Sequence, residues 1–242
     1  MTSDNQLTFK SDMDCELIAS MGGDDAVIRA MLVSTKGIIP DADMDPSAMR
    51  GRINFLMKNR HGTPFEHGSM TFRISTPIFV IRELHRHRIG FSYNEESARY
   101  KQLDPVFYVP SGDREMIRVG KPGNYEFVKA SVPKANDVIA RIVSNSSRAY
   151  QNYQAMIDDG IAPEVARMVL PVNIYSSQYV TCNPRSLMSF LSLRQKFSEE
   201  EAMFPSKPLK EINMLADKME EALEDLFPLT HAAYVANKRV AP

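Results

Sequence analysis

Residues 75–100 of the chain read STPIFVIRELHRHRIGFSYNEESARY, an apolar half followed by a polar half. Ser75-Thr76-Pro77 places a hydroxyl group and a proline where the cap and first turn of a helix favour them. The apolar side chains from Ile78 to Leu84 are expected to point inward, and the helix is expected to end near Gly90. The polar half therefore begins at the end of a buried helix.

That polar half, Arg86 to Tyr100, holds three arginines, a histidine, an asparagine and two carboxylates within fifteen residues. The simplest interpretation of Arg86-His87-Arg88 is a solvated helix end, where cations complement the helix dipole. The segment continues, however, with asparagine, serine and tyrosine, which are hydrogen-bonding residues suited to a ligand. Because arginine binds phosphate through paired hydrogen bonds, the segment favours a cleft for a phosphorylated ligand.

A second polar group begins at Asn183-Pro184, which predicts the capped start of a helix that runs to Arg194. Arg185 and Ser189 are four residues apart and share one face of that helix. Arg194 lies nine residues after Arg185, roughly half a turn around the axis. Either the helix ends before Arg194 or its two faces serve different sites, and Arg194 alone could simply complement the helix dipole.

The other segments mix helices and strands without a regular βαβ rhythm, which favours an α+β fold with a central, mostly antiparallel sheet flanked by helices. Strands are predicted at residues 17–20, 70–75, 103–110 and 172–181, and helices at 46–60, 133–159, 163–170 and 209–226. Asp24 or Asp25 is expected to cap a further helix, and Thr230 to Pro242 to form a tail. No repeat or linker interrupts the chain, so residues 1–242 are expected to form a single domain.

The composition is that of an ordinary globular protein, with 43% hydrophobic and 24% charged residues among 242. A formal net charge of −1 gives no general basic field, which argues against nucleic acid and anionic membranes as partners. The polar N-terminus does not resemble a secretory signal, and no apolar run reaches the roughly 18 residues that span a bilayer. A cytoplasmic protein without a membrane partner is therefore expected.

Neither cysteine nor metal chemistry is indicated. Cys182 precedes a predicted helix start, where a thiol can become acidic, but no histidine is close in sequence and a small buried residue is expected. His85 and His231 are expected to be structural, and no Cys/His cluster or His-Glu-x-x-His spacing predicts a metal.

A nucleotide- or RNA-binding protein without turnover is the alternative to an enzyme. Phe91, Tyr93 and Tyr100 interleave with basic residues, as binding of a single strand could require. The net charge and the lack of a known RNA-binding motif argue against this alternative.

The segment from Arg86 to Tyr100 resembles the signature of flavin-dependent thymidylate synthases, which is Arg-His-Arg followed after seven or eight residues by Ser. Eight residues separate Arg88 from Ser97 here, the longer form of the signature. Three further segments resemble motifs of the same family: Thr63–His67, Ala166–Pro171 and Asn183–Met188. Four ordered motifs make this resemblance far more specific than an isolated Arg-His-Arg.

The resemblance implies a homotetramer that binds FAD at an inter-subunit site, with dUMP stacked on the flavin ring. The implied cofactor-binding residues are Ser34, Ser69, Arg86, His87, Arg88, Glu95, Asn183, Arg185 and Ser189. It further implies NADPH as the reductant of FAD and methylenetetrahydrofolate as the carbon donor.

The resemblance also implies a dUMP site, in which Ser97 and Arg99 bind the phosphate. The implied substrate-binding residues are Glu83, Leu84, His85, Arg86, Glu95, Glu96, Ser97, Ala98, Arg99, Arg167 and Arg194. Arg194 is the implied catalytic residue, because a fixed guanidinium beside the uracil can stabilise negative charge at N3 or the adjacent oxygen. Reductive methylation of dUMP to dTMP is the expected activity.

Two departures from the family pattern are visible. Many relatives carry Asn where this chain has Ser189. Many also carry His-Ala-Gln-x-Glu-Ile after the catalytic arginine, whereas only Glu211-Ile212 is retained within residues 206–212 of this chain. No role is therefore carried over to that segment.

Overall fold

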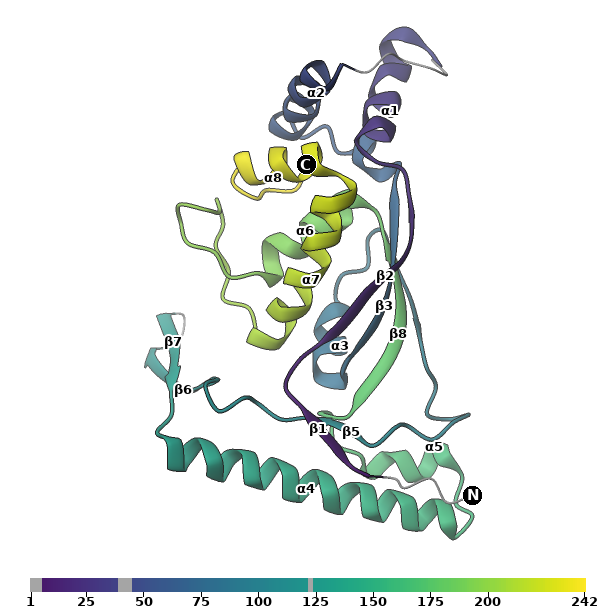
Figure 1. The fold of residues 1–242 in the computed structure, drawn as a ribbon, viewed down its shortest axis with the longest axis vertical. Helices are drawn as coiled ribbons and strands as arrows, with labels where there is room; N and C mark the ends of the chain where they lie inside the picture. The colour runs from purple at the N-terminus through teal and green to yellow at the C-terminus, as the bar shows by residue number, and fades with distance from the viewer. Residues whose placement is uncertain (1–5, 39–44, 122–123) are drawn as a thin grey trace. The chain divides into compact units, whose positions relative to one another are not determined.

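The computed structural model describes residues 6–38, 45–121 and 124–242 (Figure 1), and the first five residues of the polar N-terminus lie outside these ranges. Internal contacts divide the chain into two compact units. Unit 1 consists of Met1–Asp12, Thr76–Phe79 and Glu96–Ser176, and unit 2 of Met13–Ser75, Val80–Glu95 and Ser177–Pro242. Helices and antiparallel strands occur together, which confirms the α+β class.

Unit 2 is built on a four-stranded sheet with the order β2-β3-β8-β4. Its strands are β2 (Asp14–Met21), β3 (Ser69–Pro77), β8 (Tyr175–Cys182) and β4 (Phe91–Glu95). The β2–β3 and β4–β8 pairs are antiparallel, and Phe91 lies opposite Cys182. Met70, Phe72 and Ile74 of β3 are fully buried, as expected for a strand whose successive side chains point to opposite faces of the sheet, one of them packed on the core.

Helices of unit 2 cover this sheet and extend beyond it. They are α1 (Asp24–Lys36), α2 (Pro46–Lys58), α3 (Ile78–Leu84), α6 (Pro184–Arg194), α7 (Lys210–Leu226) and α8 (Pro228–Ala236), with the 3-10 helix η1 at Thr63–Glu66. Ile212, Leu215, Met219 and Leu223 form the buried stripe of α7, which lies along β2 and against α6 and α8 (Figure 1). The predicted helices at 46–60 and 209–226 are thus confirmed.

Unit 1 is organised around the long helix α4 (Val132–Asp158). Phe107, Tyr150, Tyr153 and Ile174 form its core, beside the parallel strands β1 (Thr8–Lys10) and β5 (Val106–Tyr108). The remaining elements are the hairpin β6 (Glu115–Lys121) and β7 (Asn124–Lys129), helix α5 (Pro163–Ala166) and the 3-10 helix η2 (Arg167–Val169). Among the residues described, no helix is both long and apolar enough to cross a bilayer.

The segment before the signature differs from the prediction. Ser75-Thr76-Pro77 does not begin a helix but completes strand β3, and α3 starts only at Ile78. A proline disfavours the helical conformation in the residue before it, so Thr76 stays extended and buried. The helix also ends at Leu84, well before Gly90, where the Leu84 carbonyl oxygen accepts from the His87 N–H at 3.0 Å and from the Tyr93 hydroxyl at 2.9 Å.

The expected cap of α1 is likewise wrong. Gly23 is the N-cap residue of α1 and no side chain caps this helix. The Asp24 carboxylate instead accepts hydrogen bonds from the backbone N–H groups of Leu229 (2.7 Å) and Thr230 (2.9 Å). A carboxylate at this position satisfies the free N–H groups of a helix start, and α8 forms where the sequence predicts a tail.

Candidate functional site

A cavity of about 840 Å³ lies in unit 2, where the signature segment after α3 meets the start of α6. Its lining includes many of the residues predicted to bind a cofactor: Arg86, His87, Arg88, Asn183, Arg185 and Ser189. These residues come from segments about a hundred positions apart in the chain, and the fold brings them together as the sequence motifs imply.

Gly90 allows the signature turn to approach α6 this closely. Its φ of 68° lies in the left-handed region, and a Cβ at this position would stand 2.1 Å from Ser186 Oγ and 2.8 Å from Asn183 Nδ2. Asn183 is fixed in turn, because its side-chain oxygen accepts from the Ser186 N–H at 2.8 Å as the predicted cap of α6. The tight contact between turn and helix therefore depends on glycine at position 90.

The wall of the cavity is mainly cationic. Arg86 and Arg88 are exposed on it, and Arg185 donates through Nη1 to Glu66 (2.6 Å) and through Nε to the carbonyl oxygen of Pro242 (2.7 Å). The start of α6 adds the positive end of a helix dipole. This combination suits an anionic, phosphate-bearing ligand.

Sequence reasoning missed several lining residues: Glu66, Ile89, Gly90, Phe91, Ser186, Ala241 and Pro242. Gly90 and Phe91 lie inside the quoted signature, so a glycine directly after Arg-His-Arg-Ile could have been noticed. Ala241 and Pro242 carry no such signal, because only the tertiary fold brings the chain after α8 to the cavity.

Arg194 is the last residue of α6, and its guanidinium is held by residues outside that helix. Its Nε donates to His87 Nε2 at 3.0 Å, Nη1 donates to Glu83 Oε2 at 2.7 Å, and Nη2 donates to the Glu83 carbonyl oxygen at 3.3 Å. Helix α6 thus reaches Arg194, so it does not end before that residue, and Arg185 and Arg194 contact different groups. A mere partner of the helix dipole would not need such contacts.

His87 connects the cavity with Arg194. Burial, and then the neighbouring Arg194 guanidinium, lower the pKa of His87 to about 4, so its ring is neutral near pH 7 and can accept from Arg194. The same ring packs edge-on against Phe190, with centroids 5.0 Å apart, and lines the cavity. One side chain therefore touches both the cofactor-sized space and the predicted catalytic group.

Three of the predicted cofactor residues do not line this cavity. The Ser34 hydroxyl is exposed on α1 and donates to the Met31 carbonyl oxygen at 3.0 Å. Ser69 begins β3 opposite Met21, and Glu95 ends β4 opposite Gln178.

The predicted substrate residues are divided between the units. Glu83, Leu84, His85, Arg86, Glu95 and Arg194 belong to unit 2, and Glu96, Ser97, Ala98, Arg99 and Arg167 belong to unit 1. Leu84 is fully buried in the single chain. His85 Nε2 lies 2.9 Å from Gln178 Oε1, and His231 Nε2 lies 2.8 Å from Glu220 Oε1, so both histidines have the structural partners expected of them.

In unit 1 the expected phosphate ligands form one short turn. The Arg99 N–H donates to Ser97 Oγ at 3.3 Å, and the Arg99 guanidinium donates to Glu164 at 2.9 Å. Ala98 is buried between them, whereas Arg167 is exposed at the start of η2. The serine hydroxyl and the guanidinium are thus presented by neighbouring residues.

Cys182 is confirmed as a small buried residue. It is 2% exposed, and burial, together with Cys15, raises the pKa of its thiol above the usual range. A thiolate nucleophile is therefore disfavoured at this position. Within the described ranges, no group of histidine, cysteine and carboxylate side chains is arranged to hold a metal ion.

Comparison with known proteins identifies the family. The sequence matches the family model described as thymidylate synthase complementing protein over residues 16–229. The flavin-dependent thymidylate synthase of Streptomyces coelicolor is 50% identical over 242 residues, covering 99% of this chain and 97% of that protein. That of Tropheryma whipplei (strain TW08/27) is 47% identical over 235 residues, covering 97% of both.

Solved structures agree with these sequence matches. A crystal structure of PolB, a UMP/dUMP methylase from Streptomyces cacaoi bound with 5-Br dUMP, has a TM-score of 0.91 and 45% identity, covering 98% of this chain and 100% of that one. The same methylase bound with 5-Br UMP has a TM-score of 0.89 and 44% identity, covering 98% and 99%. The chain therefore belongs to the flavin-dependent thymidylate synthase family, whose members are methyltransferases.

Proposed function

We propose that the chain catalyses the reductive methylation of dUMP to dTMP, with FAD as cofactor, methylenetetrahydrofolate as carbon donor and NADPH as reductant. One observation carries this proposal: the Arg194 guanidinium is fixed against His87, which also forms part of the cavity wall. The reaction needs a cation beside the uracil and a cofactor close to it, and His87 contacts both the Arg194 guanidinium and the cavity.

The cavity fits FAD on physical grounds. Its volume of about 840 Å³ is within the range of cofactor sites, roughly 300–1,000 Å³. Arg86, Arg88 and Arg185 supply cations for a diphosphate, and the start of α6 adds the positive end of its helix dipole. No Gly-x-Gly-x-x-Gly turn occurs in the sequence, so we assign FAD binding to these residues and not to a Rossmann turn.

The residues proposed to bind FAD are Arg86, His87, Arg88, Asn183, Arg185 and Ser189. We further propose that Ser34, Ser69 and Glu95 contribute to the same cofactor across a subunit boundary of a homotetramer. This assignment would account for their positions outside the cavity of the single chain.

We propose that dUMP is bound by Glu83 to Arg86, Glu95 to Arg99, Arg167 and Arg194. Ser97 and Arg99 would bind the phosphate, since a hydroxyl and a guanidinium lie on one turn. The methylase PolB is described as acting on UMP and dUMP, so UMP is a second candidate substrate. Because the family match spans both units, we propose that residues 1–242 work as one cytoplasmic enzyme domain.

The role proposed for Arg194 is electrostatic. Its remaining N–H groups would face the uracil at N3 or the adjacent oxygen and stabilise the negative charge that builds up there as C5 attacks the one-carbon electrophile. An arginine stays protonated at any working pH, so this help requires no proton transfer from the guanidinium itself. The bound flavin would supply the redox chemistry, while the protein supplies orientation and charge.

The test is anaerobic turnover of the purified protein with FAD, dUMP, methylenetetrahydrofolate and NADPH, followed by chromatography of dTMP. FAD and NADPH are omitted in turn, and UMP replaces dUMP in a parallel assay. Formation of dTMP that needs both FAD and NADPH is the expected result. Bound flavin without dTMP would overturn the proposed reaction, and the absence of both would favour the nucleotide- or RNA-binding alternative.

A further inference from the structure

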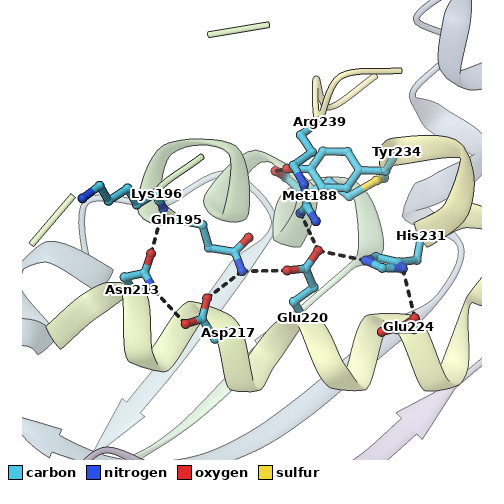
Figure 2. Close-up of polar contacts among 10 residues, drawn as sticks. All are labelled: Met188, Gln195, Lys196, Asn213, Asp217, Glu220, Glu224, His231, Tyr234 and Arg239. Atoms are coloured by element: carbon cyan, nitrogen blue, oxygen red, sulfur yellow. Dashed lines mark hydrogen bonds and ion pairs between the residues drawn. The ribbon is translucent and has the colours of Figure 1, made fainter. Parts of the chain in front are cut away.

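Two carboxylates on α7 hold the residue that directly follows Arg194 at the end of α6. Gln195 is 3% exposed, and its side-chain amide donates to Asp217 Oδ1 at 2.9 Å and to Glu220 Oε2 at 2.6 Å. Figure 2 shows Gln195 reaching both carboxylates on α7. We call Gln195, Asp217 and Glu220 the α6 anchor.

Glu220 is the centre of the anchor. It also accepts from His231 Nε2 at 2.8 Å and from Arg239 Nη1 at 2.5 Å (Figure 2). Burial by itself would raise the pKa of Glu220, but the hydrogen bonds from His231, Gln195 and Arg239 outweigh it and lower the pKa to about 2. Glu220 is therefore ionised over the whole working pH range and remains a strong acceptor.

The backbone at the end of α6 is held as well. The Gln195 N–H donates to Leu191 O at 3.1 Å, and the Ser206 hydroxyl lies 2.8 Å from Leu193 O and 3.1 Å from Gln195 O. The next N–H, of Lys196, donates to Asn213 Oδ1 at 2.7 Å. The last carbonyl groups of a helix usually lack partners and the last turn frays, whereas here side chains from the following segment hold that turn.

The anchor contains one feature that does not favour stability. Gln195 Oε1 is buried and has no hydrogen-bond partner among the described residues. A buried polar atom without a partner destabilises a fold, and an apolar side chain often replaces a buried charged network without loss. Stability alone therefore does not explain the glutamine, whose N–H groups connect it to both carboxylates.

We propose that Gln195 and Glu220 are positioning residues that act through Arg194. Glu83 and His87 hold the guanidinium, and the α6 anchor holds the backbone of the next residue, so Arg194 is fixed at both ends. This inference rests on the catalytic role proposed for Arg194. A shift of about 1 Å in a catalytic group can slow a reaction by about a hundredfold, so loosening the anchor lowers kcat without removing any ligand contact.

The test compares Gln195→Met, which keeps the side-chain length but removes both N–H donors, with the parent protein. Gln154→Met is the matched control, because Gln154 also donates to a carboxylate, that of Asp158 at 3.0 Å, but on α4 of unit 1. We expect Gln195→Met to lower kcat about tenfold or more, while KM for dUMP and flavin content stay within about twofold. Gln154→Met is expected to match the parent in all three.

Glu220→Gln serves as a second variant in case Gln195→Met does not fold. It keeps the shape of the side chain but sets an amide N–H against one of the donors that contact Glu220 in the parent protein. Unchanged kcat in a folded variant would overturn the inference, even if the melting temperature fell, and so would a joint loss of kcat, dUMP binding and flavin. Failure of both variants to fold would also overturn it, by making the anchor a requirement of folding.

Failure of this inference can be told apart from failure of the proposed function. If Arg194→Ala abolishes turnover while Gln195→Met and Glu220→Gln keep it, only the positioning role is wrong. If Arg194→Ala turns over like the parent, the role of Arg194 itself is wrong.

Discussion

Arg194, His87 and Glu83 show how much of the proposed chemistry rests on single side chains. The guanidinium is fixed because a carboxylate and a neutral imidazole accept from it in different directions. The sequence motif predicts that these residues belong to one site. It does not predict that His87 contacts Arg194, because that contact depends on where α6 ends relative to the signature.

The lowered pKa of His87 gives a prediction about stability and pH. The unfolded chain binds a proton at His87 near the ordinary histidine pKa of 6.5, whereas the folded chain binds it only near a pKa of about 4. Below pH 6.5 the unfolded state therefore gains protons that the folded state does not, and stability is lost as the pH falls from 6.5 towards 4. Above pH 6.5 this contribution is constant.

His87→Gln removes that titration while its amide oxygen can still accept from Arg194. We expect the unfolding free energy of the parent to fall more steeply than that of His87→Gln between pH 6.5 and 4, as measured by urea unfolding. If the unfolding free energies of the parent and of His87→Gln fell in parallel over this interval, the pKa of His87 would not be lowered in the folded protein.

At the scale of elements, the contact between the signature turn and α6 depends on Gly90. Gly90→Ala would combine an unfavourable positive φ with a Cβ only 2.1 Å from Ser186 Oγ. Gly160→Ala is the matched control, because Gly160 also has a positive φ, 80°, but no atom lies within 4 Å of the Cβ that alanine would add.

We expect both glycine variants to lose stability, by about 1 kcal/mol from placing alanine at a positive φ alone. Gly90→Ala should lose more, and should retain less flavin after gel filtration, because the turn must move away from α6. Equal unfolding free energies and equal flavin contents for the two variants would contradict the proposed closure of the turn on α6.

A second prediction at this scale concerns Asp24 as the cap of α8. Asp24→Asn weakens the acceptor that contacts Leu229 and Thr230, and we expect a loss of about 1–2 kcal/mol in urea unfolding. The neighbouring Asp25→Asn is the control, since Asp25 is exposed and makes a 3.5 Å pair with Arg29 on its own helix. Similar losses in both variants would argue against the capping role.

The elements also show where sequence reasoning holds and where it stops. Asn183 caps α6 as the sequence predicts, because the signal is local. Ser75-Thr76-Pro77 gives an equally good local signal for a helix start, but pairing of β3 with its neighbours in the sheet overrides it. The cap of α8 could not be predicted, because Asp24 acts on residues more than two hundred positions away.

For the whole molecule, the α+β class follows from the mixture of predicted helices and strands and the family from ordered motifs, and the structure and the relatives confirm both. The sequence could not show that Ala241 and Pro242 form part of the cavity, since the chain after α8 carries no motif. It also could not show that the substrate motif is divided between two compact units. Both features arise from the tertiary fold alone.

The most direct test of the central claim is anaerobic dTMP formation by the parent protein and by Arg194→Ala, assayed together with FAD, dUMP, methylenetetrahydrofolate and NADPH. Arg141→Ala is the control, because Arg141 donates to Asp137 at 2.9 Å on the exposed face of α4. Loss of one such electrostatic group typically slows a reaction by about 10²–10³, so we expect Arg194→Ala to fold, to retain flavin and to lose turnover on that scale. Turnover by Arg194→Ala at the parent rate would contradict the account of this site.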